Sequence, residues 1–156
     1  MPNLNNPDFD DVRDHPGYRA RRAKVGFQGG ATKTGLSYWE VEPGEAAYPY
    51  HAHLTEEEII VVQTGRPSLR TPEGWRELEP GEVVVFPTGE QGAHQIVNKS
   101  DERVSFLSFS NSGAPEIVIQ LDAGKIGAFE RPVDGGGMKL WFREADAVEY
   151  FEGLDA

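Results

Sequence analysis

The chain has 156 residues, enough for one domain with a hydrophobic core and short for two. Its 26 acidic and 15 basic residues give a formal charge of −11, which would repel a phosphate backbone and argues against nucleic-acid binding. The absence of cysteine excludes disulfides and thiolate ligands, so any metal must be held by nitrogen and oxygen atoms, and it fits a cytoplasmic location.

The N-terminal residues are polar and acidic, MPNLNNPDFDD, where a secretory signal needs a basic start and an apolar run. No apolar stretch approaches the ~18 to 20 residues of a membrane span, so we expect no contact with a membrane. Residues 1–30 contain several prolines and the pair Gly29 and Gly30 but no clear periodicity. We predict an extended N-terminal arm here, lying across the domain or, in a homodimer, on the partner.

The rest of the chain predicts an all-β fold, because short β-like runs alternate with turn residues every eight to twelve residues or so. Glycine and proline are frequent, at 18 and 11 residues. A further strand over 138–142 and a short helix over 145–151 are expected to pack on the barrel or sandwich. The predicted runs span residues 36–42, 48–53, 58–63, 68–71, 75–78, 82–86, 94–98, 103–110 and 117–121.

Three of the four histidines fall in two short segments rich in turn residues and carboxylates. His51 and His53 are one residue apart, so on a strand both imidazoles leave the same face and can converge on one point. If a four-residue hairpin loop follows, Glu58 lies opposite His53, and with a three-residue loop Glu57 takes that place. Periodicity leaves these alternatives open. His94 follows a later strand that a rolled barrel can bring beside the first.

Two stretches resemble the motifs of the cupin family. Gly44-x6-His51-x-His53-x4-Glu58-x6-Gly65 is similar to the first cupin motif, and Gly81-x5-Pro87-x-Gly89-x4-His94-x3-Asn98 is similar to the second. Both depart from the family pattern by extra residues, one before His51 and two before His94. The likeness extends less sharply over about residues 17–121, toward bacterial single-domain cupins of mostly unassigned activity.

This resemblance implies a fold and a ligand set. The fold is a double-stranded β-helix, or jelly-roll barrel, over residues 31–125, between the arm (1–30) and a C-terminal segment (126–156). The metal ligands would be His51, His53, Glu58 and His94, and the spacing to Gly65 favours Glu58 over Glu57. A homodimer is the family's usual state.

Three imidazoles and one carboxylate suit one divalent transition metal, Fe, Mn, Ni or Zn. The leading hypothesis is a metal-dependent enzyme acting on a small oxygen-rich metabolite by oxygenation, isomerisation or decarboxylation. The alternatives are a non-catalytic module that binds a small molecule such as a sugar, and a metal that only braces the barrel. Glu56 is expected in a solvated loop, and His15 is expected to be exposed and inert. Six aromatic residues are candidate pocket walls: Trp39, Tyr48, Tyr50, Phe86, Phe106 and Phe109.

Overall fold

A computed structural model of the chain describes residues 1–111, 115–130 and 137–154. The fold is all-β, as the sequence predicts, with one four-residue helix, α1 (Val25–Gln28), and three 3-10 helices, η1 (Glu90–Gly92), η2 (Leu121–Ala123) and η3 (Glu144–Asp146). No described helix is both long and apolar enough to cross a membrane. The strands are β1 (Asp11–His15), β2 (Tyr18–Ala23), β3 (Thr34–Val41), β4 (His51–His53), β5 (Glu58–Thr64), β6 (Ser68–Thr71), β7 (Gly74–Glu77), β8 (Val83–Phe86), β9 (Gln95–Val97), β10 (Val104–Asn111), β11 (Glu116–Gln120), β12 (Lys125–Phe129) and β13 (Lys139–Arg143).

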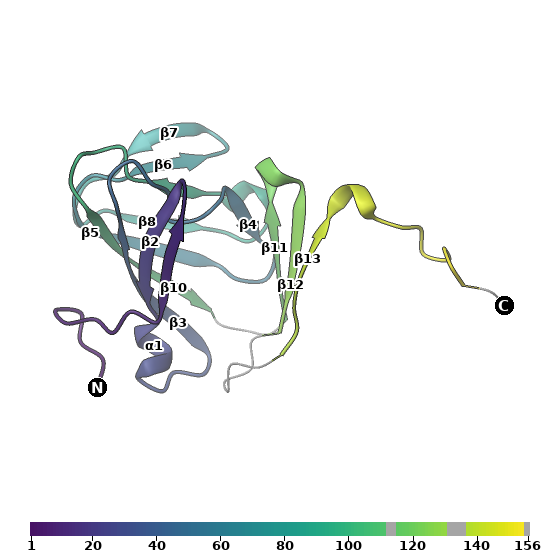
Figure 1. Cartoon of the computed structure of the whole chain (residues 1–156), viewed down its shortest axis with the longest axis horizontal. Helices are drawn as coiled ribbons and strands as arrows, with labels where there is room; N and C mark the ends of the chain where they lie inside the picture. The colour runs from purple at the N-terminus through teal and green to yellow at the C-terminus, as the bar shows by residue number, and fades with distance from the viewer. Residues whose placement is uncertain (112–114, 131–136, 155–156) are drawn as a thin grey trace.

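The described strands form three sheets that enclose one core (Figure 1). The largest has the order β1-β2-β3-β10-β5-β8, and the others are β13-β12-β11-β4 and β7-β6-β9. Two isolated bridges run beside these sheets: Ala46, which precedes β4, pairs with Val97 of β9, and His51 of β4 pairs with His94, which precedes β9. Sequential strands therefore often lie in different sheets, as expected of a jelly roll.

Strand β5 shows how its sequence selects this arrangement. Its β-branched run favours a strand buried on one face, and the side chains of Ile60 and Val62 are fully or almost fully buried. They pack in a core that includes Trp39, Tyr48 and Phe106, with the Trp39 and Phe106 rings stacked at 5.9 Å between centroids. The row that contains Ile60 and Val62 also contains Glu58, so Glu58 begins the inward-facing row.

The N-terminal segment contains more regular structure than an extended arm. Strands β1 and β2 form an antiparallel hairpin whose second strand pairs with β3 of the same chain. Partly buried arginines of this hairpin form ion pairs with acidic neighbours, Arg21 with Glu40 and Arg22 with Asp11. These charged strands lack apolar alternation, which explains why the sequence pattern does not indicate them.

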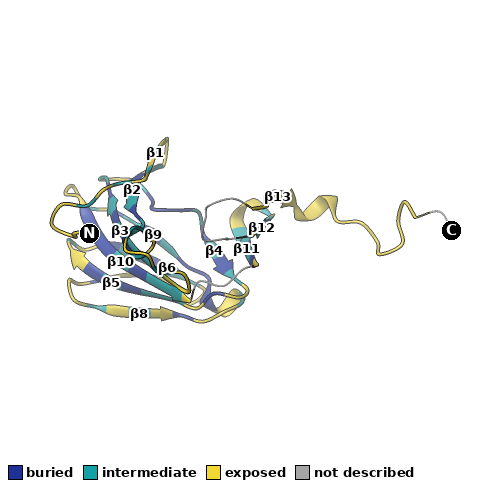
Figure 2. Ribbon diagram, turned by 90° about the horizontal axis from the view of Figure 1, so that it is seen from below, coloured by how far each residue is buried: buried dark blue, intermediate teal, exposed yellow. Residues whose placement is uncertain are grey.

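The C-terminal segment also differs from expectation. Strand β12, which was not predicted, pairs with β11 and with β13, so the hairpin extends the second sheet. The expected helix over 145–151 is instead η3 followed by turns, and residues 137–154 are exposed along their whole length. Figure 2 shows this segment running away from the barrel rather than packing on it. The division of the chain at residues 30 and 125 stays a prediction.

Asn98 ties the loop before β10 to the barrel, as the sequence suggests. The buried amide nitrogen donates to the carbonyl oxygens of Val41 at 3.0 Å and Glu102 at 2.7 Å, and Oδ1 accepts from Ser100. Replacing Asn98 with alanine is expected to lower the free energy of unfolding by about 2–3 kcal/mol, because buried backbone carbonyls lose their donors. Urea unfolding measures this loss, and Ser100→Ala, which leaves both donations of the Asn98 amide in place and removes only the hydroxyl contacts to Asn98 and Glu102, should cost about half as much or less. A loss for Asn98→Ala no larger than that for Ser100→Ala would contradict this account.

Candidate metal centre

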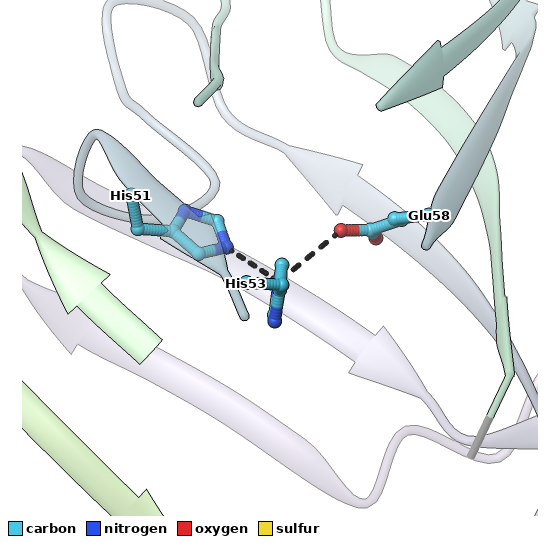
Figure 3. Close-up of side chains that lie close together, drawn as sticks. All are labelled: His51, His53 and Glu58. Carbon is cyan, nitrogen blue, oxygen red and sulfur yellow. Dashed lines mark hydrogen bonds and ion pairs between the residues drawn. The ribbon is translucent and has the colours of Figure 1, made fainter. Parts of the chain in front are cut away.

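The first two histidines of the candidate site lie on β4 and point into the barrel (Figure 3). The Nε2 atoms of His51 and His53 are 3.0 Å apart. Nδ1 of His51 lies 2.9 Å from the carbonyl oxygen of Pro49, which can only accept, so this nitrogen carries the proton. In the neutral ring, Nε2 of His51 therefore presents its lone pair to the interior.

Glu58 approaches these histidines from the opposite sheet. Its Oε2 lies 3.5 Å from Nε2 of His53. The expected hairpin between β4 and β5 is wrong, because β4 pairs with β11 whereas β5 pairs with β10 and β8. The loop between them crosses from one sheet to the other, so the two side chains meet across the barrel. Glu57 is exposed in that loop and does not join the cluster.

His94 enters between η1 and β9. Its backbone exchanges two hydrogen bonds with His51, at 2.9 and 3.2 Å, and its Nδ1 lies 2.9 Å from the carbonyl oxygen of Gly92. The ring is fully buried and stacks on Phe86 at 3.8 Å between centroids. Nε2 lies 3.1 Å from Oε2 of Glu58 but has no hydrogen-bond partner of good geometry among the described residues.

The four residues predicted from the motifs thus lie together, and the arrangement fits a divalent metal. One donor atom from each of His51, His53 and Glu58 lies within 4.8 Å of the others. His94 adjoins them through Glu58 and the His51 ring, whose centroid is 4.7 Å away. Two of the imidazoles direct Nε2 inward because Nδ1 faces a backbone carbonyl, an arrangement typical of metal-binding histidines. The buried Nε2 of His94 has no hydrogen-bond partner among the described residues, and a bound metal would satisfy its lone pair.

Burial and mutual charge perturb these groups strongly. Burial, together with the charges of His94 and His53, holds the pKa of His51 well below 6.5. Burial also acts to lower the pKa of His53, but hydrogen bonds with Glu116 and Glu58 outweigh it and raise that pKa to about 9. Burial acts to raise the pKa of Glu58, yet the close contacts with His53 and His94 and their charges hold it well below 4.5. The cluster thus combines a carboxylate, a neutral imidazole and a histidine with a high pKa.

Two of the six candidate aromatic residues contact the histidines. Phe86 stacks on His94, and Tyr48 meets the His51 and His94 rings edge to face at 4.9 and 5.6 Å. The Tyr48 hydroxyl is buried with no hydrogen-bond partner among the described residues. Burial, followed by the Glu58 charge, raises the Tyr48 pKa well above 10, so the hydroxyl keeps its proton.

Two acidic residues that the sequence does not place in the site lie behind His53. Glu116 of β11 is fully buried, and its Oε1 is 3.5 Å from Nδ1 of His53. Glu56 is only 3% exposed, so the expectation that it lies in a solvated loop is wrong. The crossing loop turns Glu56 inward, where its carboxylate lies within 4.8 Å of donor atoms of His53 and Glu116. Only packing between residues about 60 positions apart creates this pair, so local sequence carries no signal of it. His15 is exposed, as expected.

Comparisons with known proteins agree with this fold. The Cupin_2 family, described as a cupin domain, matches residues 37–110. A sugar phosphate isomerase of the cupin superfamily from Silicibacter pomeroyi aligns with a TM-score of 0.80, 22% identity and 94% coverage of each chain. The polyketide cyclase RemF of Streptomyces resistomycificus aligns with a TM-score of 0.62 and 25% identity, over 74% of this chain and 82% of that one.

A cupin-2 domain protein of Rhodospirillum rubrum aligns with a TM-score of 0.54 and 21% identity, over 69% of this chain and 78% of that one. A comparison with curated protein sequences found no match. The motifs, the sheet topology and these alignments all lead to one assignment. Residues 37–110 of the chain form a cupin domain, and the chain has the fold of the cupin superfamily.

Proposed function

We propose that this cupin is an enzyme that depends on one divalent transition metal and acts on a small oxygen-rich metabolite. The observation that carries the proposal is the convergence of His51, His53, Glu58 and His94 from three segments of the barrel. These four residues would hold the metal through three imidazole nitrogens and one carboxylate. Fe, Mn, Ni and Zn all accept such ligands.

A bound metal would supply Lewis acidity toward substrates with neighbouring oxygens, such as hydroxy-ketones, diols or 2-oxo acids. The protein's own groups would complete the site. Tyr48 offers a protonated hydroxyl that needs an acceptor, since it is buried without one. Phe86 holds the His94 ring by stacking, which limits its rotation.

The reaction class is proposed as isomerisation, decarboxylation or oxygenation. The sugar phosphate isomerase from Silicibacter pomeroyi matches nearly the full length of this chain, which supports assaying isomerisation first. A non-catalytic module that binds a sugar is the alternative carried over from the sequence. A cytoplasmic location remains a prediction from the sequence.

Metal analysis combined with a substrate panel tests the proposal. Protein loaded with Mn²⁺, Fe²⁺, Ni²⁺ or Zn²⁺ is incubated with aldoses, ketoses, their phosphates and 2-oxo acids, and products are followed by NMR. Turnover that disappears on chelation and in Glu58→Gln, but persists in Glu57→Gln, is the expected result. Full turnover after complete metal removal would overturn metal dependence. Thermal stabilisation by a sugar without turnover would instead support the binding module.

Metal binding is expected to release protons, because a histidine must be neutral to donate its lone pair. His53 has a pKa of about 9 in the metal-free protein, so it is protonated at pH 7. Binding at pH 7 should therefore release close to one proton, and metal affinity should rise by up to about tenfold per pH unit until the pH passes that pKa. Titration calorimetry in buffers of different ionisation enthalpy measures the released proton. If the binding enthalpy at pH 7 is the same in every buffer, no proton is released and the expectation is wrong.

A further inference from the structure

The C-terminal hairpin and the chain after it expose many large apolar side chains. Tyr150, Phe151 and Leu154 are 86%, 75% and 69% exposed, far more than apolar residues that a fold has covered. On β13, Trp141 and Phe142 are 43% and 52% exposed. Figure 2 shows the chain after β13 as an exposed segment that extends away from the barrel. Burying it would be favourable, so the surface needs a partner.

A groove of about 690 Å³ lies on the same hairpin, away from the histidines, with Trp141, Phe142 and Val148 among its apolar walls. Its charged residues are Lys125, Arg143, Glu144 and Asp146. Neither Lys125 nor Arg143 forms an ion pair within the described residues. The groove thus offers apolar walls together with two cations and two carboxylates.

The chain beyond the groove carries apolar side chains that match the apolar walls of the groove. The segment 149–154, here called the tail, carries Tyr150, Phe151 and Leu154 together with the acids Glu149 and Glu152, and it has no basic residue. It cannot fill the groove of its own chain in the observed conformation, since Val148 lines the groove and the tail then runs outward (Figure 1). Its acidic residues also disfavour an anionic lipid surface.

We propose that the tail of one copy occupies the groove of a second copy, and that the exchange is reciprocal. One two-fold axis satisfies both grooves, so the assembly closes as a dimer. Full burial of an aromatic side chain removes roughly 150–250 Å² from solvent. Because Trp141, Phe142, Tyr150 and Phe151 are 43–86% exposed, they together supply roughly 380–640 Å² of the ~800 Å² per partner of a stable interface. Val148 and Leu154, each 69% exposed, add to this area. The N-terminal arm, the element expected to reach a partner, instead pairs with β3 of its own chain.

Sedimentation velocity of the full chain and of point variants tests the exchange. Wild type should be a dimer, and Tyr150→Ala/Phe151→Ala should raise the dimer Kd at least about 30-fold, as expected when aromatic anchors are lost. Val83→Ala/Val85→Ala is the matched control, because those residues are 59% and 52% exposed on the edge strand β8 and do not line the groove. A monomeric wild type, or a dimer unaffected by the tail variant, would overturn the proposal.

Mixing two defective variants distinguishes tail-in-groove exchange from contacts between tails. Phe142→Glu damages the groove and spares the tail, whereas Tyr150→Ala/Phe151→Ala damages the tail and spares the groove. A mixed dimer retains one intact contact, while each variant alone retains none. The mixture should therefore dimerise more tightly than either variant, and equal or weaker association would refute the exchange. Unchanged far-ultraviolet circular dichroism confirms that both variants fold.

A second and independent observation concerns His53, whose Nδ1 faces no backbone carbonyl. It lies 3.5 Å from Oε1 of Glu116 and has no hydrogen-bond partner of good geometry among the described residues. Oε1 of Glu116 accepts a hydrogen bond from the backbone nitrogen of Leu54 at 3.2 Å, and Oε2 accepts one from Thr55. These contacts fix a fully buried carboxylate directly behind the ring.

We infer that Glu116 is a positioning residue that accepts the Nδ1 proton of His53 and so directs Nε2 toward His51 and Glu58. This inference rests on the proposed metal site. Carboxylates that orient metal-binding histidines in this way typically contribute 10–100-fold to metal affinity. The sequence separation of more than 60 residues between His53 and Glu116 hides the relationship from any local motif.

Titration with Zn²⁺ and NMR of the His53 ring test this role. Glu116→Ala should weaken Zn²⁺ binding by about 10–100-fold and shift His53 away from its Nδ1-protonated form. Glu116→Gln should restore part of the affinity, because its amide oxygen can accept the same proton. Thr55→Val removes the hydroxyl contacts to Glu116 and to the Pro115 carbonyl oxygen but keeps the Glu116 carboxylate, so it is the control for a structural effect and should bind Zn²⁺ nearly as wild type does. If wild type itself binds no metal, the proposed function fails; if wild type and Glu116→Ala bind equally, only the role of Glu116 fails.

Discussion

Replacing His51 with alanine is expected to lower affinity for Mn²⁺ or Zn²⁺ by at least about 100-fold, since even outer-shell residues of metal sites contribute 10–100-fold. His51 is at the centre of the cluster, with its Nε2 3.0 Å from that of His53 and its ring beside that of His94. Its Nδ1 is held by Pro49, so the ring has one orientation in which to bind. Without His51, only His53, Glu58 and His94 remain as ligands, and three ligands hold a metal less tightly than four. Competition with a chromophoric chelator measures the change.

Two controls separate ligand loss from unfolding. His15→Ala removes an exposed histidine far from the cluster in sequence and should leave affinity unchanged. The backbone bridge between residues 51 and 94 does not depend on the side chain, so the thermal unfolding of metal-free His51→Ala should remain cooperative. Affinity within threefold of wild type in a folded His51→Ala would exclude His51 as a ligand.

The sequence predicts much of the barrel because its strands alternate with strong turn residues. Each of the nine predicted runs from 36 to 121 overlaps an observed strand, and the run 68–71 coincides with β6. Gly65 and Gly81 mark turns with φ of 72° and 86°, where other residues are strained. The charged strand β2 gave no comparable signal, because its pairing with β3 depends on tertiary contacts.

In the candidate site, too, local spacing predicts some features, whereas others depend on contacts between segments that are distant in the sequence. Period two predicts that His51 and His53 share a face, and the structure confirms it. Choosing Glu58 over Glu57 needed the motif spacing, and the burial of Ile60 and Val62 now supports the same inward row. The predicted hairpin was wrong because loop length alone does not reveal that the chain crosses between sheets. Glu116 reaches the site from β11, more than 50 residues after His53 in the chain, and no local pattern specifies that contact.

The loop that carries His94 contains a glycine whose importance the sequence does not reveal. A Cβ atom at Gly92 would lie 1.7 Å from the carbonyl oxygen of Pro87 and 2.8 Å from its carbonyl carbon. Both are backbone atoms, so no side-chain rotation relieves the clash. Gly92 also supplies the carbonyl that receives Nδ1 of His94, at 2.9 Å. Its lack of a side chain therefore allows the tight η1 turn and the orientation of the ligand together.

Replacing Gly92 with alanine is accordingly expected to damage both stability and metal binding. The free energy of unfolding should fall by about 3 kcal/mol or more, at or above the upper end for added atoms in a packed site. Metal affinity should fall by at least about tenfold, because the loop must move and His94 with it. Gly89→Ala is the matched control: its φ of 85° strains alanine, but the new Cβ meets nothing within 4 Å. That variant should lose about 1 kcal/mol and bind metal nearly as wild type does. Equal behaviour of the two variants in urea unfolding and metal titration would show that close packing at Gly92 does not position His94.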